Sequence, residues 1–163
     1  MGSAQTVLVD LMKGRRTLGA TLGLTDDDVE RVVQIARGHL AAGRVRDAQT
    51  LLDGLCALLP NVAALQQLRG LARERTREWQ IAIEAYSAAV RLLDDAADDR
   101  RALAYAARGM ARLRAGDAAG ALIDLALARP HLGDEAGPLA ADVERFIGRC
   151  AETLEANASA GGA

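Results

Sequence analysis

The sequence predicts an all-α fold made of stacked helix-turn-helix repeats, and three observations support this prediction. Pairs of small residues stand twelve positions apart three times along the chain, at Ala36 and Ala48, Gly70 and Ala82, and Gly109 and Ala121. The second members of these pairs are separated by 34 and then by 39 residues. Residues 69–73 and 108–112 also share the pattern Arg-Gly-x-Ala-Arg at the same phase. We interpret these features as an internal duplication.

A spacing of 34 residues is the period of the tetratricopeptide repeat, a helix-turn-helix unit. Small residues are needed where two antiparallel helices approach closely, because a larger side chain would wedge them apart and open a void. We therefore expect a right-handed superhelix of three repeats within residues 24–157, at about 29–62, 63–101 and 102–135.

The N-terminal segment 1–23 is expected to form an arm. Glycines prevent a long helix, but one apolar stripe of a short helix could form. Its members are Val7, Leu8, Leu11 and Met12. Disorder and a partner-binding helix are the two alternatives for this arm.

Helix ends can be placed in the repeats. Thr25 followed by Asp28 predicts the N-cap of the first repeat helix. Gly43 and Gly116 share one phase and are expected to end the first helices of their repeats, and Pro60 marks the end of the first repeat. An acidic stretch at 94–99 is expected to be a solvated loop, since it lacks the alternating ligands and the glycine of a calcium loop.

A capping helix is expected over 138–157, because a repeat stack needs a terminal helix with a charged outer face. Its apolar positions are Leu139, Val143, Phe146, Ile147 and Leu154. The small-residue tail 158–163 is expected to be disordered.

Composition argues against several function classes. A net charge of -2, with arginines interleaved among acids, disfavours a nucleic-acid partner. No apolar run reaches the roughly 20 residues of a membrane span, so we expect no membrane insertion and a cytosolic protein. Neither His39 nor His131 has a surrounding catalytic or ligand pattern, and Cys56 and Cys150 read as buried apolar residues. We expect no enzyme activity, no metal and no cofactor.

The candidate functional surface is the inner wall of the superhelix. Counted from Val29, Ala63 and Ala102, positions two, five, nine and twelve lie at helical spacing on the side of each first helix that faces away from the second helix. The residues at these positions are Glu30, Val33, Arg37 and Leu40, then Ala64, Gln67, Leu71 and Glu74, then Leu103, Ala106, Met110 and Leu113. A mostly apolar wall favours an extended or helical peptide with a few hydrophobic anchors. The alternative is that these residues are core, covered by the arm or by a second subunit.

Four arginines stand at positions where packing residues are expected: Arg69, Arg73, Arg108 and Arg112. We expect their stems to pack and their guanidinium groups to pair with Glu84 or Asp124.

Landmarks along residues 19 to about 155 carry a family resemblance. They are the capped start near Thr25, Leu55-Cys56-Ala57, Gly70 followed by Arg73, Ala82-Ile83 before Tyr86-Ser87, Ala106-Ala107, and Ala115-Gly116-Asp117 before the terminal helix. With these landmarks the chain resembles the class II type III secretion chaperones, the tetratricopeptide chaperones of bacterial translocator proteins. Two features depart from the family pattern: the five-residue insertion after the second repeat, and Leu65 and Gln66 where the family tends to carry aromatic residues.

The resemblance implies a non-enzymatic chaperone of the bacterial cytoplasm. It would hold a hydrophobic, pore-forming translocator protein in its concave groove before export. The resemblance also implies a homodimer formed by the N-terminal arm, which fits its apolar residues. The alternative function is a generic scaffold that joins protein partners through other surfaces.

Overall fold

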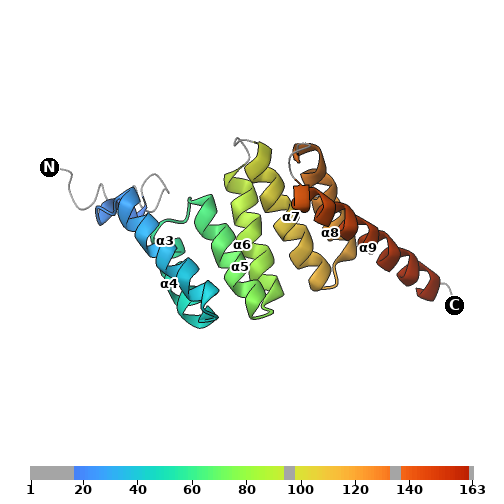
Figure 1. The fold of residues 1–163 in the computed structure, drawn as a ribbon, viewed down its shortest axis with the longest axis horizontal. Helices are drawn as coiled ribbons and strands as arrows, with labels where there is room; N and C mark the ends of the chain where they lie inside the picture. The colour runs from blue at the N-terminus through green and yellow to red at the C-terminus, as the bar shows by residue number, and fades with distance from the viewer. Residues whose placement is uncertain (1–16, 94–97, 133–136, 162–163) are drawn as a thin grey trace.

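The described part of the chain is a row of antiparallel helices, each packed mainly against the next one in sequence (Figure 1). A computed structural model describes residues 17–93, 98–132 and 137–161. The elements are α2 Leu18–Thr21, α3 Asp26–Ala41, α4 Val45–Leu58, α5 Ala63–Arg75, α6 Trp79–Leu92, α7 Asp98–Arg114, α8 Ala118–Ala128, the 3-10 turn η1 Arg129–His131 and α9 Gly137–Gly161. The all-α helical-repeat fold is therefore confirmed.

The structure has the predicted N-cap at the start of α3 and the predicted glycines at the ends of α3 and α7. The Thr25 hydroxyl accepts a hydrogen bond from the backbone N–H of Asp28 at 3.2 Å, and the Asp28 carboxylate accepts one from the backbone N–H of Thr25 at 3.1 Å. Gly43 and Gly116 follow α3 and α7 with φ values of 73° and 91°. At the same turn of the middle repeat stands Arg77, whose φ is 61°, a conformation that non-glycine residues seldom adopt.

Two boundaries differ from the sequence prediction. α9 continues to Gly161, so residues 158–161 of the expected disordered tail are helical. Alanine favours a helix, and the Ser159 hydroxyl donates to the Glu155 carbonyl at 2.9 Å. α7 begins at Asp98, which places two residues of the expected 94–99 loop in a helix. Residues 94–97 and the arm residues Val7, Leu8, Leu11 and Met12 lie outside the described residues.

The small-residue pairs stand where helices pack most closely, as predicted. Their alanines, Ala36, Ala48, Ala82 and Ala121, are fully buried. A Cβ added at Gly70 would lie 2.5 Å from the Tyr86 ring of α6, and one added at Gly109 would lie 3.2 Å from the Ala121 carbonyl of α8. These glycines therefore set the separation between the two helices of the second and third repeats.

The core consists of three clusters along the row. The first joins α3, α4 and α5, and the last joins α7, α8 and α9. Between them, Ala82 and Tyr86 of α6 pack with Ala111 of α7. Because each cluster is shared by neighbouring helices, every repeat fixes the orientation of the next.

Candidate peptide-binding groove

One open cavity of about 260 Å³ lies across the first helices of all three repeats. We call it the groove pocket. Its lining residues are Arg37 from α3, Ala64, Gln67, Leu68 and Leu71 from α5, Tyr86 from α6, and Leu103 and Ala107 from α7. The lining is mainly apolar, with Arg37 and Gln67 as its longer polar side chains.

Five of the predicted wall residues line this pocket: Arg37, Ala64, Gln67, Leu71 and Leu103. Leu103 is the most exposed of its apolar members, with half of its surface open to solvent. The pocket thus brings together residues from three repeats that lie up to 70 positions apart in the sequence, from Arg37 to Ala107.

The remaining predicted wall residues lie elsewhere. Val33, Leu40 and Ala106 are buried, the first two in the cluster shared with α4 and α5 and the third in the cluster of α7 to α9. Leu113 is half-buried and packs against that last cluster, and Met110 is half-buried outside the pocket lining. Glu30 is exposed and accepts a hydrogen bond from Gln34. Three of the proposed wall positions are therefore core positions.

The reason lies in the rotation of each helix about its own axis. In α5 the lining residues stand at i, i+3, i+4 and i+7, as Ala64, Gln67, Leu68 and Leu71 do. The sequence interpretation placed i+10 on the wall in place of i+4. Both sets of positions follow the helical period. A helix face about 100° wide, however, includes i+3 and i+4 together. That rule identifies Leu68, and Ala107 at the same phase of α7, which the sequence interpretation missed.

Tyr86 is the other missed residue, and it comes from a second helix. Its ring reaches the pocket because Gly70 opposite it has no side chain. Burial, together with the nearby Glu74 carboxylate, raises the pKa of Tyr86. Gly109 contacts Leu125 of α8 in the same way, again sixteen residues later. This repeated spacing is the sequence signal that could have identified Tyr86.

Glu74 connects the pocket to the third repeat. Its carboxylate accepts a hydrogen bond from Arg114 of α7 at 2.9 Å, and the Arg114 guanidinium lies 6.0 Å from the centre of the Trp79 ring. Burial raises the pKa of Glu74, and Arg114 opposes this shift. Glu74 therefore faces a neighbouring repeat and supports Tyr86 from outside the pocket.

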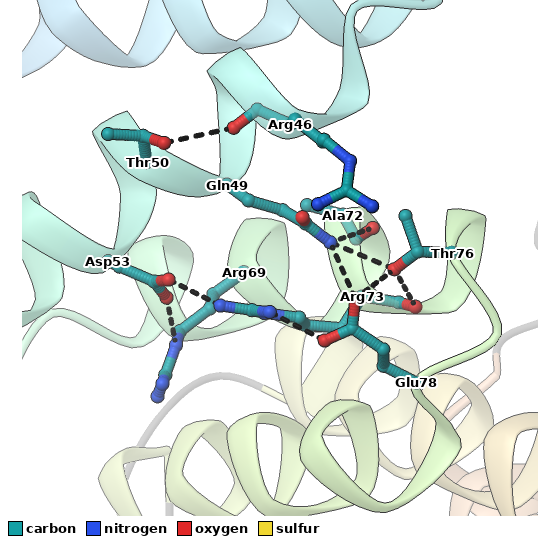
Figure 2. A network of polar contacts seen from close by, with 9 residues as sticks. All are labelled: Arg46, Gln49, Thr50, Asp53, Arg69, Ala72, Arg73, Thr76 and Glu78. Carbon is teal, nitrogen blue, oxygen red and sulfur yellow. Dashed lines mark hydrogen bonds and ion pairs between the residues drawn. The ribbon is translucent and has the colours of Figure 1, made fainter.

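A polar network fixes α5 against α4 (Figure 2). Arg69 donates from Nε to Asp53 at 2.8 Å, and Arg73 donates both to Asp53 and, at 2.6 Å, to Glu78. The Gln49 side-chain amide donates to the Ala72 carbonyl at 3.2 Å. These contacts constrain the rotation of α5, and so the face that it presents to the pocket.

The third repeat has a related but more buried ion cluster. Arg108 donates to both carboxylate oxygens of Asp124 at 2.6 and 2.8 Å, and Arg112 approaches the same carboxylate at 3.0 Å. The Asp124 side chain is only 1% exposed. The expected pairing with Asp124 is confirmed, whereas pairing with Glu84 is wrong. Arg69 and Arg73 turn back to Asp53 because α5 packs on α4 of the preceding repeat, and Glu84 is exposed.

The histidine and cysteine side chains were candidates for a metal site. Within them no group of three histidine, cysteine or acidic side chains is placed to hold a metal ion. His39 Nδ1 lies 3.8 Å from the Asp47 carboxylate, beyond hydrogen-bond distance. Cys56 and Cys150 are free and buried as expected, and burial raises the pKa of the Cys56 thiol to about 11. None of the described helices combines the length and apolar character that a bilayer span requires.

Several solved structures have the same fold as this chain. No protein-family model and no curated protein matches the sequence. A type III secretion complex from Aeromonas hydrophila contains a chain that is 17% identical, with a TM-score of 0.82 over 91% of this chain and 97% of that one. The type III secretion translocator chaperone SycD of Yersinia enterocolitica is 19% identical, with a TM-score of 0.72 over 82% of this chain and 98% of its own.

A third similar structure is a complex. It is PcrH of Pseudomonas aeruginosa in complex with the chaperone-binding region of PopD. It is 23% identical to this chain, with a TM-score of 0.62 over 85% of this chain and 97% of PcrH. At these levels of identity the likeness establishes the fold.

Proposed function

We propose that this protein is a type III secretion chaperone of the bacterial cytoplasm, which binds a hydrophobic translocator protein and keeps it soluble and competent for export. The observation that carries the proposal is the apolar groove pocket, formed by three successive repeats in a fold shared with translocator chaperones. PcrH, which has this fold, was solved with the chaperone-binding region of PopD. The proposed role involves no catalytic step.

Holding a client in this way needs only binding energy. Each apolar anchor that enters the groove contributes roughly 1.5 to 3 kcal/mol. Three anchors, less the cost of ordering a flexible segment, give a dissociation constant of about micromolar order. Binding lowers the concentration of the free, aggregation-prone client by mass action and leaves it releasable for export.

The test is co-expression with a hydrophobic translocator protein. Leu103→Glu introduces a charge into the pocket at a half-exposed position, so the fold should survive while the client is lost in co-purification and its soluble yield falls. Ile123→Glu is the matched control, because Ile123 is 60% exposed on α8, which contributes no lining residue. Circular dichroism of both variants checks the helical fold. Equal client retention by the two variants would show that the pocket is not the binding site.

A generic scaffold is the second candidate function, and one observation favours it. Ile123 and Leu127 lie one helical turn apart on α8 and are 60% and 45% exposed, outside the groove pocket. A scaffold that uses this surface would lose its partner on Ile123→Glu and not on Leu103→Glu. It would also leave the soluble yield of a hydrophobic co-expressed protein unchanged.

We also propose that the arm forms a homodimer through Val7, Leu8, Leu11 and Met12. Support comes from the adjoining described residues, since Leu18 and Leu22 are 47% and 68% exposed. Sedimentation equilibrium of the full chain should give a dimer. Leu8→Asp with Leu11→Asp should give a monomer with unchanged helicity, and a persistent dimer would place the interface elsewhere.

A further inference from the structure

Arg37 differs from the arginines that face neighbouring helices, because it has no acidic partner among the described residues. Those other arginines are all ion-paired: Arg69, Arg73, Arg108, Arg112 and Arg114. Arg37 is exposed on α3 and lines the groove pocket, yet none of the pocket's lining residues is acidic. One helical turn away on either side stand only uncharged residues, namely Val33, Gln34, Leu40 and Ala41.

Gln67 is a second polar lining residue whose side chain makes no hydrogen bond to another described residue. Its amide offers one acceptor and two donors, which suits the backbone of an extended peptide. The apolar residues Leu68, Leu71 and Leu103 complete the same pocket. The pocket thus combines a hydrophobic cavity, an unpaired positive charge and an uncommitted amide.

We infer that the groove pocket selects a client segment in which an aspartate or glutamate side chain lies close to an apolar anchor residue. Leu68, Leu71 and Leu103 hold the anchor, Arg37 pairs with the carboxylate, and Gln67 bonds the peptide backbone. The inference rests on the proposed function and specifies the kind of segment that is recognised.

The carboxylate belongs to a side chain and not to a chain terminus. A C-terminal carboxylate is commonly held by consecutive backbone N–H groups of a loop or turn. Apart from Ala64 in the first turn of α5, the lining residues of this pocket stand within helices where those groups are already bonded, and Arg37 is the sole cationic lining residue. One arginine is enough for a single carboxylate side chain.

The partly exposed position of Arg37 limits the size of its effect. Exposed ion pairs stabilise a complex by little, so a segment with the acid should bind about two- to fivefold more tightly than its amide counterpart. The charge acts mainly on selectivity, because a lysine or arginine at that place would be repelled.

Selection from a library of random peptides displayed on phage tests the inference without knowledge of the client. The wild-type protein should enrich peptides that carry an apolar residue with an aspartate or glutamate nearby. Arg37→Gln should retain the apolar preference and lose the acidic one, and Arg37→Glu should enrich lysine or arginine in its place. Arg46→Gln removes an exposed arginine from α4, which contributes nothing to the pocket, and should select as the wild type does.

The outcomes separate this inference from the proposed function. Apolar selection without acidic enrichment, or acidic enrichment that survives Arg37→Gln, overturns the inference and leaves the proposed function standing. Failure of the wild type to select apolar anchors overturns the proposed function itself. As a quantitative check, one selected peptide and its amide counterpart should differ about two- to fivefold in affinity for the wild type at low salt. The two peptides should bind the Arg37→Gln variant with equal affinity. About 1 M salt should remove the difference seen with the wild type. An equal ratio for both proteins would overturn the inference.

Discussion

Replacing Gly70 with alanine should destabilise this protein, although alanine favours a helix more than glycine does. The added Cβ would lie 2.5, 2.7 and 2.8 Å from Cε1, Cζ and Cδ1 of the Tyr86 ring. The ring has little room to move, because Tyr86 is only 3% exposed. Overpacking of this kind costs about 1 to 3 kcal/mol.

A matched substitution separates this cost from the gain in helix propensity. Gly54 lies within α4, and nothing stands within 4 Å of a Cβ added there. Alanine should therefore stabilise at Gly54 by up to about 1 kcal/mol. Because both sites gain that propensity, the difference between the two variants isolates the clash, at about 1 to 3 kcal/mol.

The assay is urea and thermal unfolding followed by circular dichroism at 222 nm. For a chain of this size the difference corresponds to about 2 to 12 °C in Tm. In a Tyr86→Ala background, Gly70→Ala should become as favourable as Gly54→Ala, since the ring that it strikes is gone. Equal effects of Gly70→Ala and Gly54→Ala in the wild-type background would refute the claim that Gly70 sets the α5–α6 separation.

Two further predictions concern buried charge. Asp124→Ala should lower the free energy of unfolding by about 3 kcal/mol, because it leaves two largely buried arginines without their carboxylate. Asp53→Ala should cost about 1 kcal/mol or less, since that carboxylate is 37% exposed, and equal losses in urea unfolding would contradict the role of burial. Burial raises the pKa of Glu74, so its carboxyl group binds a proton more tightly in the folded protein than in the unfolded chain. The stability that the protonated carboxyl contributes is therefore lost as the pH rises through that raised pKa. The stability of the wild type relative to Glu74→Gln should accordingly fall from about pH 4 toward neutral pH, and a constant or rising difference would contradict this sign.

The repeat architecture could be predicted because its signals are local. The capping pair Thr25 and Asp28 is only three residues apart in the sequence. Gly43 and Gly116 themselves adopt the positive φ that the turn after each helix requires. Arg77 shows the limit of this reasoning, because it takes the same turn without being glycine. There the Arg73–Glu78 ion pair and the hydrogen bond from the Glu78 backbone N–H to the Arg73 carbonyl support the turn, and no residue at the turn itself signals it.

The candidate site could be predicted only in part. The spacing identified the side of each first helix, and Arg37, Leu71 and Leu103 do line one pocket. Val33 and Leu40 have the same spacing, yet they are buried with α4 and α5. Their burial depends on where the next repeat packs, and the hydrophobic period of a single helix carries no information about that position.

By itself, the sequence determined the type of fold, the length of the repeat and the small residues at its closest contacts, because each depends on spacing along a single chain segment. Only the tertiary structure decided how far each helix is rotated, that Tyr86 enters the pocket past Gly70, and that Arg69 and Arg73 pair with Asp53 of the preceding repeat. These features arise from packing between repeats, where a rotation of a few tens of degrees exchanges a core residue for a groove residue.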